Sequence, residues 1–473
     1  MKMTAHFEQT LDRLGEIAER LRQSGMPDVE YKWTEGISTV ELAALEERLQ
    51  MTLPASLSEL IQRCGSLYLL WSLPQHCIVR DVSGRTGEHS STSDYELNIL
   101  EDITGEFGWN HEYISYFTFY GENADSPATT DEHRYLIFNY NGAGDPVLLD
   151  LATSSAEPAV FCYDHEQDRF TLLADNLPAY IDTILTLHGL WVWNWMTVTD
   201  EHGIQLKSPP LQMWVRWLDT FCNVKLEDAH SLEALIEYTT MHSVDNPVIL
   251  QAFQSYDPKD IFLAWEQRIQ HNPAQFATWF VFIGETAGDG AADWVRSLWE
   301  PDTAQAWTSL VKNNFHAVGA FTSPRAYLTA RCLPEHEGLA YVCNYLPQHS
   351  ARDGKLEGYV ANGQLHHFHS PEVIDWMRDK VNYPADGWSV LFAESYPTVE
   401  QLFDWLSDSE LHQKIVAGAL EVMIKKGRVP SLKADALNTI SNLLQASLQR
   451  VMLKKDKRRI EAVLEQLSDL GLC

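Results

Sequence analysis

The chain has few basic residues and no long apolar run. Its 473 residues hold 35 Lys and Arg against 66 Asp and Glu, so the formal net charge is -31. No stretch approaches the ~20 consecutive apolar residues of a membrane-spanning helix, and the first ten residues lack the apolar region of a secretory signal. Because a negative field repels nucleic acid and anionic lipid, we expect a cytoplasmic protein that binds neither nucleic acid nor membrane.

Paired cysteines and catalytic motifs are also missing. The seven cysteines are scattered and form no Cys-x-x-Cys pair, which argues against a disulfide framework and a zinc ribbon. We find no Gly-x-Ser-x-Gly elbow, no His-Glu-x-x-His and no dinucleotide fingerprint. The glycine-rich segment Asn141–Asp145 lacks the Gly-Lys-Ser/Thr that a phosphate loop requires, so we interpret it as a hairpin turn. We therefore expect no enzyme and no cofactor.

Helix signals dominate the first 65 residues. Apolar residues at helical spacing predict a helix over Phe7–Arg22. Ser38 and Glu41 have the spacing of a capping box, and Ser56 with Glu59 offers a second cap of the same kind for a short helix.

The sequence pattern then changes to short runs rich in β-forming residues, separated by polar turns. A helix through Leu177–Leu187 closes this region. We predict an antiparallel meander from four of the runs: Tyr135–Phe138, Val147–Leu151, Ala159–Tyr163 and Phe170–Leu173.

Helical signals take over beyond about residue 208. Asp257-Pro258 and Ser370-Pro371 each place a capping residue before a proline at the first helical position. Thr398 with Gln401 forms a further capping box. Short helices with short connections indicate antiparallel pairs that could stack as a solenoid. Gln348–His369 is the most loop-like stretch of this part, with Gly354, Gly358 and Gly363 spaced through it.

Three groups of residues follow one another along the chain: Leu45-Glu46 with Leu49, Leu53-Pro54, Leu57 and Leu60; Asn141–Asp145 with Leu148–Leu151; and Pro158–Val160 with His165 and Ala174-Asp175. In these residues and their order, the segment from about residue 30 to residue 190 resembles the SUKH superfamily, which includes fungal cell-wall assembly regulators and bacterial immunity proteins. The resemblance implies a mixed sheet with helices packed beside it, which acts by binding other proteins and has no active site.

We thus expect an α+β, SUKH-like domain at residues 1–195 and an all-helical domain at 196–473. A subdivision of the helical domain near 348–370 stays open. The acidity is concentrated in the first part, since residues 1–200 hold 11 Lys and Arg against 32 Asp and Glu.

Acids alternate with aromatics between residues 101 and 132, a composition expected of a surface that binds a basic partner. A strand pair with a charged outer face would give the same pattern. The predicted partner-binding residues are Glu101, Asp102, Glu106, Trp109, Glu112, Tyr113, Glu122 and Asp125.

Three other clusters have a functional and a structural interpretation each. His366-His367-Phe368-His369 could bind metal, but a polar loop explains it more simply. Trp191, Trp193 and Trp195 could anchor a partner or pack between the domains. The basic run Lys454–Arg459 fits a solvated helix face or an intramolecular match to the acidic N-terminal domain better than it fits nucleic acid.

We expect a protein-binding protein, most simply an immunity protein that neutralises a basic toxin domain by stoichiometric association. A cytosolic scaffold or regulator is the alternative. An enzyme built on the histidine cluster is a third and weaker hypothesis.

Overall fold

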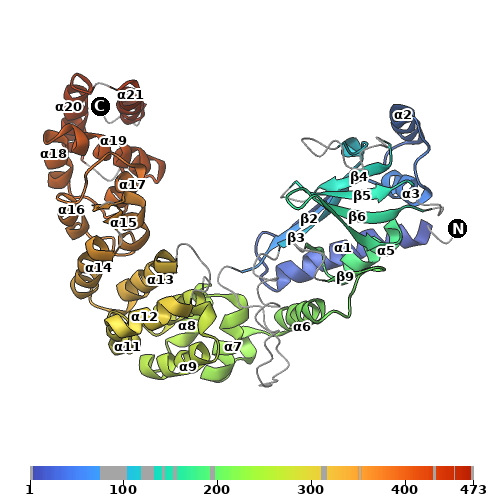
Figure 1. Ribbon diagram of the computed structural model, residues 1–473, viewed down its shortest axis with the longest axis horizontal. Helices are drawn as coiled ribbons and strands as arrows, with labels where there is room; N and C mark the ends of the chain where they lie inside the picture. The colour runs from blue at the N-terminus through green and yellow to red at the C-terminus, as the bar shows by residue number, and fades with distance from the viewer. Residues whose placement is uncertain are drawn as a thin grey trace. The chain divides into compact units, whose positions relative to one another are not determined.

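The computed structural model describes residues 4–74, 104–118, 133–140, 144–152, 157–191, 198–244, 246–310, 317–349, 351–352, 354–429, 433–451 and 453–469. They form two compact units, Met1–Asn246 and Pro247–Cys473 (Figure 1). The first is an α+β unit and the second consists almost entirely of helices, which confirms the predicted fold class.

The first unit, called the sheet unit here, begins with a helix and ends with two. Its helices are α1 (Thr4–Gln23), α2 (Thr39–Leu49), α3 (Ala55–Arg63), α5 (Leu177–Thr186), α6 (Pro209–Asn223) and α7 (Leu232–His242). Its strands are β1 (Glu30–Glu35), β2 (Cys64–Ser72), β3 (Thr104–Asn110), β4 (Tyr135–Tyr140), β5 (Pro146–Asp150), β6 (Ala159–Asp164), β7 (Arg169–Ala174), β8 (Leu190–Trp191), β9 (Thr199–Asp200) and β10 (Gly203–Ile204).

The longer strands form two four-stranded sheets, with orders β1-β2-β3-β8 and β4-β5-β6-β7. The second sheet is the predicted meander, and Asp164 at its last turn accepts hydrogen bonds from the amides of Glu166 and Gln167. Every strand pair among the described residues is antiparallel, where the resemblance implied a mixed sheet. Helices α1 and α5 contact each other and the strands (Figure 1).

The two predicted caps of the N-terminal helices have different outcomes. Ser38 and Glu41 form the complete capping box of α2. The second cap is wrong, because α3 begins after Pro54 and has no side-chain cap of its own. Instead, Glu157 reaches back from the other sheet and accepts hydrogen bonds from the amide and the hydroxyl of buried Ser56. A distant carboxylate therefore satisfies a helix start that the local sequence cannot.

The sheet unit extends beyond the predicted boundary at residue 195 because α6 belongs to its core. Trp214 and Trp217 of α6 are fully buried there, and Trp214 stacks on Trp71 of β2 with ring centroids 5.4 Å apart. The Trp214 indole N–H donates to the carbonyl of Leu187, 3.2 Å away. Asp219 of α6 forms an ion pair with Arg20 of α1.

The second unit, called the helical unit here, contains one short hairpin besides its helices. The hairpin is β11 (Ala351–Arg352) with β12 (Lys355–Leu356). The helices are α8 (Pro247–Phe253), α9 (Pro258–His271), α10 (Phe276–Thr286), α11 (Ala292–Ser297), α12 (Pro301–Leu310), α13 (Ala317–Cys332), α14 (Glu335–His349), α15 (Gly358–Leu365), α16 (Glu372–Met377), α17 (Asp386–Glu394), α18 (Val399–Ser407), α19 (Glu410–Lys425), α20 (Ala434–Leu448) and α21 (Lys454–Asp469).

Contacts between these helices follow a regular order. Helix α13 packs on α15, α15 on α17, α17 on α19, and α19 on α21, while α18 packs on α20. Each of these helices thus meets the one two positions further along, as in a solenoid whose units bury their apolar faces on their neighbours. The caps predicted at Asp257 and Thr398 are both present, and the hydroxyl of Ser370 accepts the amide of Glu372 at the start of α16.

The loop predicted at Gln348–His369 is wrong. This stretch contains the end of α14, the hairpin and all of α15, because Leu356, Leu365 and Phe368 supply buried apolar contacts. These side chains join the same core cluster as residues of α14 and α21, so the core is continuous through the point where a subdivision was left open. The three glycines that suggested a loop include Gly358, which begins α15 where a Cβ would lie 2.6 Å from the Trp388 ring.

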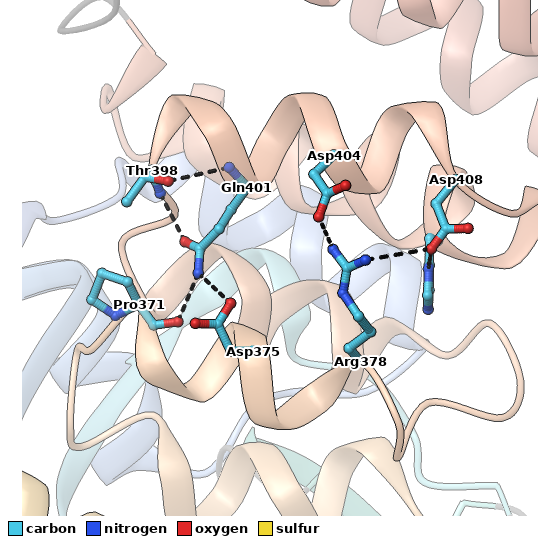
Figure 2. Close-up of polar contacts among 8 residues, drawn as sticks. Pro371, Asp375, Arg378, Thr398, Gln401, Asp404 and Asp408 are labelled. Atoms are coloured by element: carbon cyan, nitrogen blue, oxygen red, sulfur yellow. Dashed lines mark hydrogen bonds and ion pairs between the residues drawn. The ribbon is translucent and has the colours of Figure 1, made fainter.

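Polar side chains tie α16 to α18 (Figure 2). Gln401 completes the capping box with Thr398, and its amide nitrogen donates to the carbonyl of Pro371 and to Asp375, each at 2.9 Å. Arg378 of α16 forms ion pairs with Asp404 and Asp408. One side chain of α18 thereby caps its own helix and binds the start of α16.

Replacing Gln401 by Ala removes both functions together. Because the Thr398 amide loses its partner, and the Pro371 carbonyl and Asp375 lose the Gln401 amide that links them to α18, we expect the helical unit to lose about 1–2 kcal/mol of unfolding free energy. Urea unfolding measures it. Gln445→Ala, at an exposed position of α20, is the matched control and should change stability little. Equal effects of the two substitutions would contradict this role.

The buried side chain of His242, at the end of α7, should make the stability of the sheet unit depend on pH. Its ring stacks between Phe221 and Tyr238, at centroid distances of 4.2 and 4.0 Å, and burial lowers its pKa to about 4. The unfolded chain takes up the proton near pH 6.5, so this stabilisation is present above pH 6.5 and is lost as the pH falls towards 4. We expect a loss of about 1–3 kcal/mol.

The measurement compares hydrogen exchange of α7 amides in the unchanged chain and in His242→Phe, which keeps the stacking and removes the titration. The difference between the two should grow between pH 6.5 and 4. His202→Phe, at a side chain 74% exposed, is the control. A pH dependence that persists unchanged in His242→Phe would contradict the assignment.

Candidate functional site

The strands β1, β2 and β3 present a regular alternation of side chains. Along β2, Leu67, Leu69 and Trp71 are buried, whereas Tyr68 between them is exposed. The register pairs Tyr68 with Lys32 of β1 and with Gly108 of β3, and pairs Leu70 with Glu30 and Glu106. Because strand side chains alternate between the two faces, Tyr68, Lys32 and Glu106 lie on the face opposite the core.

An irregularity in β1 interrupts this pairing. The register shifts between Trp33 and Glu35, and the hydroxyl of Thr34 accepts the backbone amide of Ser66 at 2.9 Å. The side chain therefore replaces a ladder hydrogen bond, as expected at a β-bulge. Trp33 beside it stays 54% exposed although it pairs with buried Leu67.

Four exposed aromatic side chains line one hollow on this part of the molecule. They are Trp33, Tyr68, Tyr113 and Tyr140, with exposed fractions of 54, 37, 64 and 42%. The hollow, called the sheet hollow from here on, measures about 380 Å³ and is also lined by Lys32, Glu106, Asn110 and Asn139. Aromatic rings that remain accessible in a concave surface are typical anchors of binding sites.

The charges of the sheet hollow come from β1 and β3. Lys32 binds Glu30 at 2.7 Å, and this contact raises the pKa of the ammonium group. The pKa of Tyr68 is raised by burial and then by the carboxylates of Glu106 and Glu30, with Lys32 opposing them. The phenol therefore lies in a field that is negative on balance, and the hollow suits a cationic group.

A second hollow, of about 660 Å³, adjoins the first through Tyr113 and Tyr140. It is lined by Arg48 and Glu112 among others, and Arg48 donates to the carbonyl of Ile114 at 2.9 Å. The short 3-10 turn His111–Tyr113 stands between the two, held by a hydrogen bond from the Glu112 amide to Asn110. Tyr113 is thus accessible to a ligand from either side.

The structure brings some of the predicted partner-binding residues together. Glu106 and Tyr113 line the sheet hollow, and Glu112 lines the adjoining one. Trp109 also borders the sheet hollow, but its side chain is 2% exposed and donates its indole N–H to the carbonyl of Cys64 at 2.9 Å, so its ring packs in the core beneath the hollow. The predicted residues that lie outside the described ranges are Glu101, Asp102, Glu122 and Asp125.

Sequence reasoning missed Trp33, Tyr68 and Tyr140. The run Glu30–Glu35 is rich in β-forming residues between two glycines, which is a recognisable strand signal. The alternation of apolar residues in β2 would also have placed Tyr68 on the outer face. No local pattern indicates that β4 brings Tyr140 to the same hollow, since that depends on how the sheets pack.

The histidine cluster packs as the end of α15. His366 and His369 bond backbone carbonyls of Asn362 and Glu394 through their Nδ1 atoms, and burial lowers the pKa of His367 to about 3, with His366 adding to the effect. Within the described ranges no three His, Cys, Asp or Glu side chains are grouped so that they could hold a metal ion.

The tryptophan group and the basic run contribute packing and ion pairs within their own units, as far as the structure describes them. Trp191 is buried in the core of the sheet unit, and Trp193 and Trp195 lie outside the described ranges. The basic run begins α21, where Arg459 forms ion pairs with Asp386 and Glu421 of the helical unit. These ion pairs are intramolecular, but their acids belong to the helical unit and not, as predicted, to the acidic N-terminal domain.

Comparison with known proteins agrees with the resemblance seen in the sequence. Residues 36–183 match the model of the SMI1 / KNR4 family (SUKH-1), so the sheet unit contains a SUKH domain. The match covers α2 through most of α5 and includes β2, β3 and β4 of the sheet hollow, whereas β1, which carries Lys32 and Trp33, precedes it. Neither the search of curated proteins nor that of solved structures finds a significant match. Among helices of the described residues, none has both the length and the apolarity to cross a bilayer.

The backbones of β2 and β3 approach each other closely at Gly108, beside the sheet hollow. A Cβ at this position would lie 2.2 Å from the carbonyl oxygen of Leu67, so β2 and β3 would have to separate. We expect Gly108→Ala to destabilise the sheet unit by about 2–4 kcal/mol in urea unfolding. In Gly15→Ala the new Cβ meets only the Tyr31 ring, at 3.6 Å, and improved helix propensity should stabilise α1 by up to about 1 kcal/mol. A neutral Gly108→Ala would contradict this packing.

Proposed function

We propose that this chain acts by binding another protein, without catalysis, and that it is an immunity protein which neutralises a basic toxin domain. The observation that carries the proposal is the sheet hollow, which four accessible aromatic side chains and Glu106 line together in the unit that contains the SUKH domain. Members of that superfamily resemble one another in binding proteins, and some neutralise toxins. The site offers contacts for a macromolecule, with aromatics as anchors and carboxylates for steering.

Electrostatics favour a cationic partner. The whole chain carries a net charge of -31, and residues 1–200 account for most of it. Such a field accelerates encounter with a basic protein and disfavours association of the chain with itself. Neutralisation then follows from stoichiometric occupation of the toxin's active site or substrate-binding surface, and it requires no residue of this chain to react.

The alternative is a cytosolic scaffold or regulator. The successive stacking of α13, α15, α17, α19 and α21 favours it, because solenoids offer extended surfaces to partner proteins. On this alternative the SUKH domain supplies one docking surface and the helical unit another. No toxin is then needed.

Co-expression distinguishes the two proposals. Toxins encoded by neighbouring genes are expressed with and without this chain, and growth rescue is scored. Rescue that depends on the chain supports immunity, whereas no rescue from any neighbouring toxin favours the scaffold.

For a toxin that is neutralised, the association rate constant should fall by roughly tenfold between 50 and 500 mM NaCl, because salt screens the attraction between the acidic and basic surfaces. Stopped-flow mixing of the full chain with the toxin domain measures it. The dissociation rate constant should change much less. An association rate constant that is independent of salt would remove electrostatic steering from the account.

A further inference from the structure

The contents of the sheet hollow point to a particular kind of side chain on the partner. Three tyrosines and a tryptophan expose their rings there, and each ring carries a negative electrostatic potential on its faces. Glu106 adds a carboxylate from β3. Aromatic faces combined with a carboxylate are the groups that stabilise an organic cation when it leaves water.

We infer that the sheet hollow binds an arginine side chain presented by a basic partner protein. This inference rests on the proposed function and names the chemistry that the partner must supply. A guanidinium group is planar, so it stacks on a ring while its N–H groups bind a carboxylate in parallel. An ammonium group is more strongly hydrated and lacks this geometry.

The dimensions of the hollow agree with such an occupant. About 380 Å³ is enough for one long side chain with some neighbouring backbone, and lies near the lower end of small-ligand pockets. The amide side chains of Asn110 and Asn139 add hydrogen-bond acceptors on its wall. The buried ring of Trp109 lies beneath the hollow. Its indole N–H donates to the carbonyl of Cys64, and it stacks with Phe138 at a centroid distance of 6.1 Å, so it supports the hollow in a fixed position.

Among the described residues that line the hollow, Lys32 is the one cation, and it allows a test of the sign of the charge effect. Lys32 lines the hollow and has its ammonium group bound to Glu30. Its positive charge opposes an arriving guanidinium, whereas the negative charge of Glu106 attracts it. Removing each charge should therefore change the affinity for arginine in opposite directions.

The experiment titrates the full chain with the peptide acetyl-Gly-Arg-Gly-amide and follows the ¹⁹F signal of Trp33 after labelling with 5-fluorotryptophan. Trp33→Phe assigns that signal. We expect a saturable shift with a dissociation constant on the order of millimolar, as a few exposed cation–π contacts and one carboxylate allow. The peptide with citrulline in place of arginine has the same shape without the charge and should give no saturable shift.

Substitutions complete the test. Glu106→Gln and Tyr113→Ala should each weaken binding by about threefold or more, and Lys32→Gln should strengthen it. Tyr359→Ala, at a tyrosine 66% exposed in the helical unit, is the matched control and should change nothing. Tyr113 is itself 64% exposed, so its removal leaves the fold intact, which thermal unfolding checks for every variant.

Several outcomes would overturn the inference. They are equal shifts with arginine and citrulline, binding of a lysine peptide as strong as that of the arginine peptide, or the same sign of effect for Lys32→Gln and Glu106→Gln. A chain that neutralises a toxin but fails the peptide titration refutes the arginine site alone. A chain that binds the arginine peptide but rescues no cell keeps the site and loses the immunity proposal.

Discussion

The alternation of side chains along β2 and β3 is the constraint on which the candidate site depends. The indole of Trp109, hydrogen-bonded to the carbonyl of Cys64, holds the register that buries Leu67 and Trp71 on one face. The same register leaves Tyr68 and Glu106 on the other face. A slip by one residue would exchange the faces, so the buried aromatic core and the accessible aromatic surface are two consequences of one pairing.

The two units differ in where the backbone groups at helix starts find their hydrogen-bond partners. In the sheet unit, residues far apart in sequence satisfy local needs, as when Glu157 binds the start of α3. In the helical unit, caps such as Thr398 with Gln401 supply hydrogen-bond partners to a helix start from within a few residues, and nearby helices pack on one another. Stability in a stacked array of this kind accumulates from neighbour to neighbour.

Sequence alone predicted the elements whose signals are local. The capping boxes at Ser38 and Thr398, the meander and the helix over Phe7–Arg22 are confirmed, because periodicity and cap chemistry act within a few residues. It was wrong about α15, where burial of Leu365 and Phe368 overrides the glycines, and about the cap of α3. Of the site, it indicated Glu106 and Tyr113. It missed Trp33, although the signal of its strand is local, and it missed Tyr140, whose position depends on the packing of the sheets.

The central claim is that the SUKH domain meets its partner through the sheet hollow. Hydrogen–deuterium exchange of the full chain, alone and with a toxin domain that it neutralises, tests this most directly. The account predicts slower exchange in β1, in the turn His111–Tyr113 and at the end of β4, with little change in α14–α21. Protection confined to the helical unit, with the strands of the hollow unchanged, would contradict it.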